Sequence, residues 1–211
     1  MKIVVLGSGS NGGVPEWDCS CSNCRRARSQ RKHQRTRSSV ALTLDGDRYV
    51  LIDTSPDLKL QLEENGLGPR NIGTGDRYER NTRIDSILLT HGHGDHCVGL
   101  FEFSTGRCFN IPVYGPSDLI QYLFGTPSNP QFFAGLGRLA ADYVKPSALE
   151  ARRKIKLLGE KIEVEGFEIP HTAFVDGAYF PSRTYGYEVS SAGKRFVYTP
   201  DLCDLTEEVL R

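Results

Sequence analysis

Short apolar runs alternate with polar, turn-forming segments along the chain, and this pattern predicts many short strands with a few helices between them. Two of the runs, 40–44 and 48–52, flank Asp45-Gly46, a pair typical of a β-hairpin turn. Further strands are predicted at 3–6, 84–90, 111–114, 155–158, 162–164, 167–169, 184–189 and 195–198. Paired strands interrupted by helices favour an α/β sandwich of mixed sheets over a regular doubly wound fold.

Three helices are predicted between and after the strands. Thr54-Ser55-Pro56-Asp57 offers a cap and a first-turn proline for a helix that runs to about Asn65. The other two lie at 117–124 and from 204 to 211. The polar segment 65–83 is interpreted as a surface loop near the mouth of a site, and 125–146 is too irregular to assign.

Composition limits what the chain can be. Its 211 residues, 38% of them hydrophobic and 25% charged, are enough for one substantial core, so we expect a single domain over 1–211. Lysine plus arginine equals aspartate plus glutamate at 26 each, so global charge favours neither a nucleic-acid nor a membrane partner. No apolar stretch has the length of a membrane span or forms a signal peptide, and these features predict a soluble, cytoplasmic protein.

The segment His91-Gly92-His93-Gly94-Asp95-His96, which follows the predicted strand 84–90, carries the chemistry of the chain. Imidazole and carboxylate suit zinc, manganese and iron, and four donors within six residues are enough to hold two ions. The glycines allow a sharp turn on which the donors converge. Three of the five histidines fall in this segment, which favours a metal site over a solvated turn.

This segment, together with Asp53, His171 and Asp201 at the ends of other predicted strands, resembles the metallo-β-lactamase-fold hydrolases. The resemblance spans nearly the whole chain and implies an αββα sandwich of mixed sheets. Within that superfamily, the opening 7–15 and the cysteine segment 17–26 are most similar to two families. One is coenzyme PQQ synthesis protein B, and the other is the cyclic-phosphate phosphodiesterase of phosphonate breakdown.

The resemblance implies two divalent ions, zinc or manganese with iron as a further choice. It assigns His91, His93 and His171 to one ion, Asp95 and His96 to the second, and Asp201 to both. Two such ions would activate a shared water as hydroxide and neutralise charge on the substrate, so Asp95 and Asp201 are counted as catalytic. Asp53 is assigned an outer role, in which it accepts the N–H of a ligand histidine.

Each of these assignments has a structural alternative. His171 could be an ordinary strand-end histidine, Asp201 a cap or turn residue, and Asp53 a turn former. Relatives usually supply one more histidine to the second ion from a later strand, and no histidine follows His171. This departure favours a fold that is truncated at its C-terminus, and a weakly held or absent second ion is the alternative.

Cys19, Cys21 and Cys24 place three thiolates within six residues, which predicts a structural zinc in a loop that otherwise lacks regular structure. A redox pair or three buried thiols are the alternatives. In the relatives the fourth ligand can come from the C-terminal region, and His33 is a local candidate. The remaining cysteines are interpreted as small buried apolar residues: Cys97, Cys108 and Cys203.

A run of basic residues between positions 25 and 37 contains no acid. Its members are Arg25, Arg26, Arg28, Arg31, Lys32, Arg35 and Arg37. The run forms either a solvated helix face or a patch that attracts phosphate or nucleic acid. Because the run has no aromatic residues to stack on bases, a small anionic phosphate ester fits it better than RNA does.

The leading hypothesis for function is a metal-dependent hydrolase of phosphodiesters, small cyclic ones included, because the complete motif supplies the ligands that a hydrolytic two-metal site needs. The alternative is a cofactor-biosynthesis enzyme like coenzyme PQQ synthesis protein B, with a single iron and oxidative chemistry. A tRNA 3′-processing endonuclease and a non-enzymatic metal-binding protein rank below these. The sequence leaves open whether the chain forms a homodimer.

Overall fold

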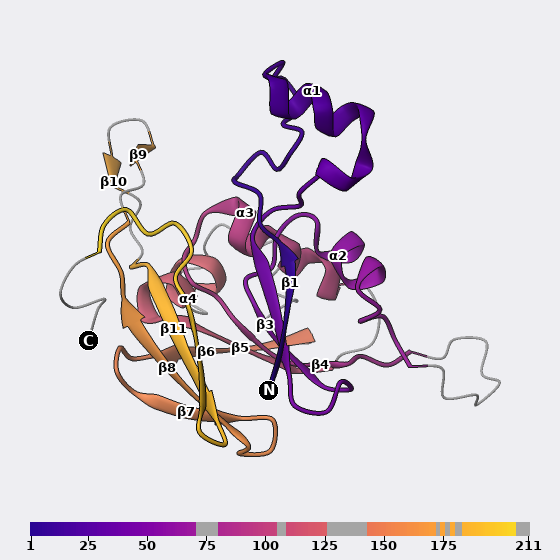
Figure 1. Ribbon diagram of the computed structural model, residues 1–211. Helices are drawn as coiled ribbons and strands as arrows, with labels where there is room; N and C mark the ends of the chain where they lie inside the picture. Colours follow the sequence, from indigo (N-terminus) through magenta and orange to yellow (C-terminus); the bar gives the residue numbers. More distant parts are fainter. Residues whose placement is uncertain are drawn as a thin grey trace.

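Two β-sheets packed face to face make up the core of the fold (Figure 1). The computed structural model describes residues 1–70, 80–104, 109–125, 143–171 and 183–205, and the backbone of 174–175 and 178–179. The larger sheet contains, in spatial order, β1 (Lys2–Gly7), β2 (Ser39–Thr43), β3 (Tyr49–Ile52), β4 (Ile84–Leu88), β5 (Ile111–Pro116) and β6 (Val144–Leu149). The smaller sheet contains β12 (Lys194–Tyr198), β11 (Tyr185–Ser191), β8 (Ile162–Glu168) and β7 (Lys154–Leu157). A two-stranded ribbon joins β9 (Phe174–Val175) and β10 (Ala178–Tyr179).

The helical segments lie between these strands along the chain. They are α1 (Ser22–Ser29), the 3₁₀ turn η1 (Arg31–His33), α2 (Leu58–Glu64), α3 (Gly94–Cys97), η2 (Val98–Ser104) and α4 (Ser117–Phe124). Pairing in the larger sheet is antiparallel from β1 to β3 and parallel from β3 to β6, whereas the smaller sheet is antiparallel throughout. The predicted α/β fold with mixed sheets is therefore confirmed.

Strands β2 and β3 are buried on both faces, which explains their nearly continuous apolar sequences. Leu51 faces a cluster with Leu58 of α2 and Leu119 of α4, whereas Val50 and Ile52 face the smaller sheet. Helices thus cover the outer face of the larger sheet, and both sides of this sheet lose apolar surface to water. Burial of each such side chain contributes about 1.5–3 kcal/mol to folding.

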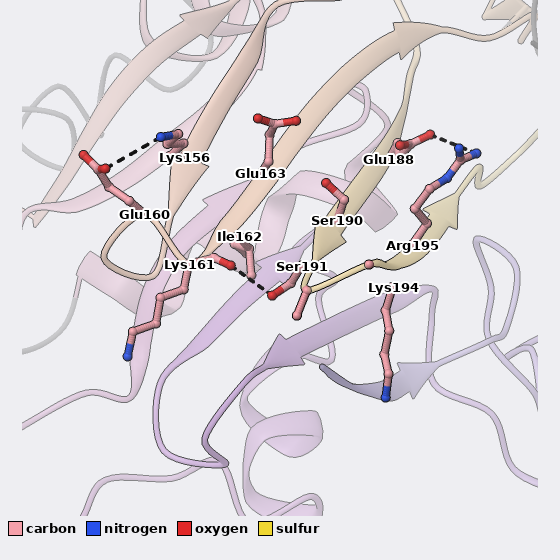
Figure 2. Close-up of a pocket in the computed structure, with 12 residues that line it drawn as sticks. Lys156, Glu160, Lys161, Ile162, Glu163, Glu188, Ser190, Ser191, Lys194 and Arg195 are labelled. Carbon is pink, nitrogen blue, oxygen red and sulfur yellow. Dashed lines mark hydrogen bonds and ion pairs between the residues drawn. The ribbon is translucent and has the colours of Figure 1, made fainter.

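The outer face of the smaller sheet carries charged side chains in cross-strand pairs. Ion pairs join Lys154 to Glu163 at 2.7 Å, Arg152 to Glu165 at 3.4 Å and Arg195 to Glu188 at 3.4 Å. A hollow of about 470 Å³ lies at the end of this sheet where β7 turns into β8 and β11 into β12 (Figure 2). Lysine and glutamate side chains mix around it, so it favours neither anions nor cations.

The secondary structure differs from the sequence-based expectation in several places, and helix α1, helix α3 and strand β6 were not predicted. One strand, β8, replaces the two predicted at 162–164 and 167–169. The helix predicted from residue 54 begins at Leu58, because residues 56–57 form a turn in which the Leu58 N–H donates to the Ser55 carbonyl at 3.0 Å. The Asp57 side chain binds Arg37 and does not cap the helix. Residues 204–205 are not helical, and the rest of the predicted C-terminal helix lies outside the described residues. No helix in the described part of the chain is long and apolar enough to cross a membrane.

Candidate metal centre

The hexapeptide 91–96 leaves the carboxyl end of β4 and turns directly into the short helix α3. His93 is the residue before the first turn of α3, and Asp95 and His96 lie within that turn. His91 and His96 are each 1% exposed and Asp95 is 7% exposed. Donors that normally lie in water are therefore held in the interior, where they need compensating partners.

Three other strands bring the remaining predicted residues to the same place. Asp53 follows β3, which is parallel to β4, so the carboxyl ends of both strands meet at one edge of the larger sheet. His171 follows β8 and Asp201 follows β12 in the smaller sheet. A hydrogen bond of 3.1 Å from the Cys203 N–H to the Pro170 carbonyl joins the last two segments.

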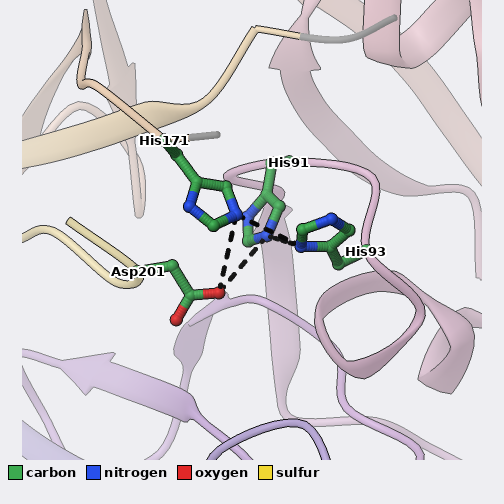
Figure 3. Close-up of side chains that lie close together, drawn as sticks. All are labelled: His91, His93, His171 and Asp201. Carbon is green, nitrogen blue, oxygen red and sulfur yellow. Dashed lines mark hydrogen bonds and ion pairs between the residues drawn. The ribbon is translucent and has the colours of Figure 1, made fainter. Parts of the chain in front are cut away.

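The first donor group consists of three imidazoles and one carboxylate (Figure 3). His93 Nδ1 lies 2.9 Å from His91 Nε2 and 3.3 Å from His171 Nε2. Asp201 Oδ2 lies 3.5 Å from His91 Nε2 and 4.0 Å from His171 Nε2. The potential ligand atoms of the group all lie within 4.8 Å of one another, close enough for one ion to reach them all after small adjustments.

The second donor group shares Asp201 with the first. His96 Nε2 lies 3.3 Å from Asp95 Oδ2 and 3.3 Å from Asp201 Oδ2. The fold thus brings together all six predicted ligands, and Asp201 faces both groups, as the predicted shared ligand must. Asp53 and Asp201 adopt positive φ angles of 62° and 54°, a sparsely populated conformation that is common at functional sites.

Asp53 contacts this centre from behind His96. Its Oδ2 accepts a hydrogen bond of 2.7 Å from His96 Nδ1, and its side chain is fully buried. The His96 ring is therefore oriented with Nε2 towards Asp95 and Asp201. This is the geometry that the predicted outer role of Asp53 requires.

The electrostatics of the cluster fit a bound cation. Burial, followed by the nearby His96 and His93, lowers the pKa of His91 to about 2, so this imidazole is neutral and able to coordinate a metal. Burial also lowers the pKa of His96, but Asp53, Asp201 and Asp95 outweigh it and raise that pKa to about 12. The three carboxylates around His96 stabilise positive charge at this position. A divalent metal ion carries more positive charge than a proton, so these carboxylates favour a bound ion even more strongly.

Comparison with known proteins agrees with this geometry. Residues 48–211 match the family model described as Beta-lactamase superfamily domain. The chain belongs to this superfamily. Its resemblance to the metallo-β-lactamase fold is thereby confirmed.

Individual relatives refine the placement within the superfamily. Coenzyme PQQ synthesis protein B of Methylorubrum extorquens (strain AM1) is 31% identical over 218 residues, which cover 99% of this chain and 68% of that protein. The crystal structure of Zn²⁺-bound PqqB from Methylobacterium extorquens has a TM-score of 0.81 and 27% identity, with 99% and 68% of the two chains covered. A diphosphatase of the PhnP family has a TM-score of 0.62 and 25% identity, with 89% and 61% covered.

The cysteine cluster is also assembled, although differently from the prediction. The Sγ atoms of Cys19, Cys21 and Cys24 lie within 4.8 Å of one another, but Cys24 is part of helix α1, so the segment is not an irregular loop. The alternative of three buried thiols is wrong, because Cys21 is exposed. Hydrogen bonds from the Cys24 backbone N–H and from the neighbouring thiols lower the pKa of Cys21 to about 7, which favours the thiolate that zinc requires. No fourth donor, His33 included, joins this group among the described residues.

Replacement of Cys24 by serine is expected to remove about one equivalent of zinc per chain, because a serine hydroxyl is a far weaker zinc ligand than a thiolate. Metal analysis by mass spectrometry after gel filtration measures this directly. Ser20→Ala, a change of similar size in the same segment, should retain the wild-type zinc content. Equal zinc content in Cys24→Ser and wild type would rule out a zinc site here.

Arginines of the basic run bind mainly within the chain. Arg28 donates to the carbonyl oxygens of Glu16 and Cys19, both at 2.5 Å, and Arg25 donates to the carbonyl of Ser20. Arg31 pairs with Glu64 and Arg37 with Asp57. These contacts hold the cysteine segment against α1 and connect the basic run to α2. The run therefore has a structural role within the chain, which differs from both a solvated helix face and a phosphate-binding patch.

The predicted burial of the remaining cysteines is only partly confirmed, and one threonine contacts the centre although the sequence analysis did not select it. Cys97 is buried as predicted, but the prediction for Cys203 is wrong: its thiol is exposed and lies 3.7 Å from His171 Nδ1. Cys108 lies outside the described residues. Thr90, which no motif singled out, contacts both Asp53 and His91.

Proposed function

We propose that this chain is a metal-dependent enzyme of cofactor biosynthesis, of the type represented by coenzyme PQQ synthesis protein B. The likeness to that family in sequence and fold over 99% of the chain carries the proposal. The diphosphatase of the PhnP family is a more distant neighbour by TM-score and by coverage. The donor cluster supplies the chemistry, because four imidazoles and two carboxylates suit a divalent ion such as zinc, manganese or iron.

His91, His93 and His171 would hold one ion and Asp95 and His96 a second, with Asp201 serving both. A divalent ion bound there polarises a substrate oxygen and makes a nearby water more acidic. Buried His91, His96 and Asp95 form the floor of the centre, whereas Asp201, with 36% of its side chain exposed, lies on the open side. We propose that a small anionic substrate approaches from this open side.

A second candidate function is hydrolysis of a phosphodiester or diphosphate. The observation that favours it is the second donor group, Asp95, His96 and Asp201, because a pair of metal ions can stabilise both the attacking and the leaving oxygen. One-metal oxidative chemistry does not require this group. The PhnP-family neighbour, described as a diphosphatase, supports the same candidate.

Genetic complementation separates the two candidates. In a bacterium that lacks its own coenzyme PQQ synthesis protein B, we expect the wild-type chain to restore coenzyme PQQ, measured by mass spectrometry of the culture. If the chain does not restore it, while the purified protein hydrolyses bis-p-nitrophenyl phosphate in the presence of metal, the second candidate replaces the first. Oxygen uptake by the iron-loaded protein would show oxidative chemistry.

Asp95→Asn is expected to lower hydrolysis by roughly 100-fold, because it neutralises a ligand of the second group and leaves His96 without one of its carboxylate partners. Initial rates at matched protein levels measure the loss. Glu160→Gln, an equal change of charge beyond the end of β7 and away from the centre, is the control and should leave the activity unchanged. Undiminished activity of Asp95→Asn would show that the second group plays no part in the reaction.

A further inference from the structure

We propose that Thr90 is a positioning residue that links the two donor groups through Asp53. The inference rests on the metal-binding part of the proposed function and assigns a role to a residue outside both groups. Thr90 lies between the end of β4 and His91, and both Thr90 and Asp53 are 0% exposed. Water therefore cannot replace the contacts that these two side chains make.

Every polar atom of Thr90 is fixed. Its N–H donates to Asp53 Oδ1 at 2.8 Å, and its carbonyl accepts from the N–H of Tyr185 at 2.9 Å. The hydroxyl oxygen lies 2.9 Å from Asp53 Oδ1 and 2.9 Å from Asp53 Oδ2. The same oxygen lies 2.9 Å from His91 Nδ1. The side chain thus bridges the carboxylate and the imidazole.

The single hydroxyl proton determines the direction of these bonds. An ionised carboxylate can only accept, so the Thr90 hydroxyl donates its proton to Asp53. The hydroxyl oxygen then has only lone pairs to offer His91, so His91 Nδ1 must carry a hydrogen and donate it. The Nε2 atom of His91 is left with its lone pair, and this atom faces His93 Nδ1 and Asp201 Oδ2.

The same reasoning holds for His96, with Asp53 as the direct partner. His96 Nδ1 lies 2.7 Å from Asp53 Oδ2 and must donate to it, which directs Nε2 to Asp95 and Asp201, where a bound ion would take the place of the Nε2 proton. One buried carboxylate therefore orients an imidazole of each donor group, His96 directly and His91 through Thr90. Loss of the Thr90 hydroxyl should remove the hydrogen bond that orients His91 and so weaken metal binding by the first group alone. Loss of the Asp53 charge should weaken metal binding by both groups.

Zinc affinity of the purified protein, titrated against a fluorescent chelator, tests this asymmetry. Outer partners of metal-bound histidines typically contribute 10- to 100-fold in affinity, so Thr90→Val should weaken the first group by roughly that factor. Thr90→Ser keeps the hydroxyl and should stay within about threefold of wild type. Repeating the comparison in the Asp95→Asn background assigns the loss to the first group, and Asp53→Asn should weaken both groups.

The outcomes separate this inference from the proposed function, because the probe is zinc alone. Wild-type protein that binds no zinc at the centre would contradict the proposed function. Normal wild-type binding that Thr90→Val leaves unchanged, or that Thr90→Ser weakens as much as Thr90→Val does, would overturn the role of Thr90. Thermal unfolding of the metal-free proteins verifies that the variants fold, and Thr90→Ala replaces Thr90→Val if the valine is not accommodated.

Discussion

Asp201→Ala is expected to lower the affinity of the centre for divalent metal by roughly 1,000-fold, more than the 10- to 100-fold that an outer partner contributes. Asp201 is the one carboxylate that belongs to both donor groups, and His96 lowers its pKa to about 2, so it is ionised at neutral pH. Its removal takes a negative charge from each group at once. Zinc titration and metal content after dialysis both measure the loss.

The matched control is Asp204→Ala, which removes an equal charge from an exposed position in the same segment. It should bind zinc as the wild type does. Equal losses in the two variants would mean that net charge, and not coordination by Asp201, governs metal binding.

Gly99→Ala should destabilise the protein by about 3 kcal/mol or more and also impair metal binding. A methyl group at this position would overlap the backbone oxygen of Ser55 and lie 2.8 Å from that of Thr54. Thr54 is hydrogen-bonded to the His96 carbonyl at 2.7 Å, so the forced shift reaches the centre directly. For a chain of this length the change corresponds to a drop in Tm of roughly 10 °C, which thermal unfolding measures.

Gly68→Ala serves as the control, because the added carbon would make only ordinary contacts, the nearest at 3.7 Å from Glu63. Its Tm should remain within about 2 °C of wild type. If Gly99→Ala were as stable as the wild type and bound zinc normally, the close packing of η2 against the Thr54–Ser55 backbone would not be required to keep Asp53 next to His96.

The sequence was sufficient for those features that depend on local patterns. Most strands follow from apolar runs between turn residues, and the Asp45-Gly46 hairpin follows from its turn chemistry. The segment 91–96 could be recognised because its donors are adjacent in sequence. The convergence of His171 and Asp201 on it followed from a family resemblance, since no spacing rule relates residues on different sheets.

Other features had no local signal. Helix α1 buries only two small residues, Cys24 and Ala27, so its apolar face is too short to stand out among the polar residues around it. Strand β6 contains Pro146, which is tolerated because β6 is an edge strand, and edge position is a property of the assembled sheet. Thr90 contacts His91 and Cys203 contacts His171 only in the folded chain. Neither contact could therefore be predicted from the residue types or their positions in the sequence.

Anomalous diffraction at the zinc absorption edge, from crystals grown with Zn²⁺, tests the central claim most directly. We expect one ion within about 2.3 Å of donor atoms of His91, His93 and His171, and a second beside Asp95 and His96, with Asp201 in reach of both. Zinc found only elsewhere on the protein, with no ion within coordination distance of these six residues, would contradict the account.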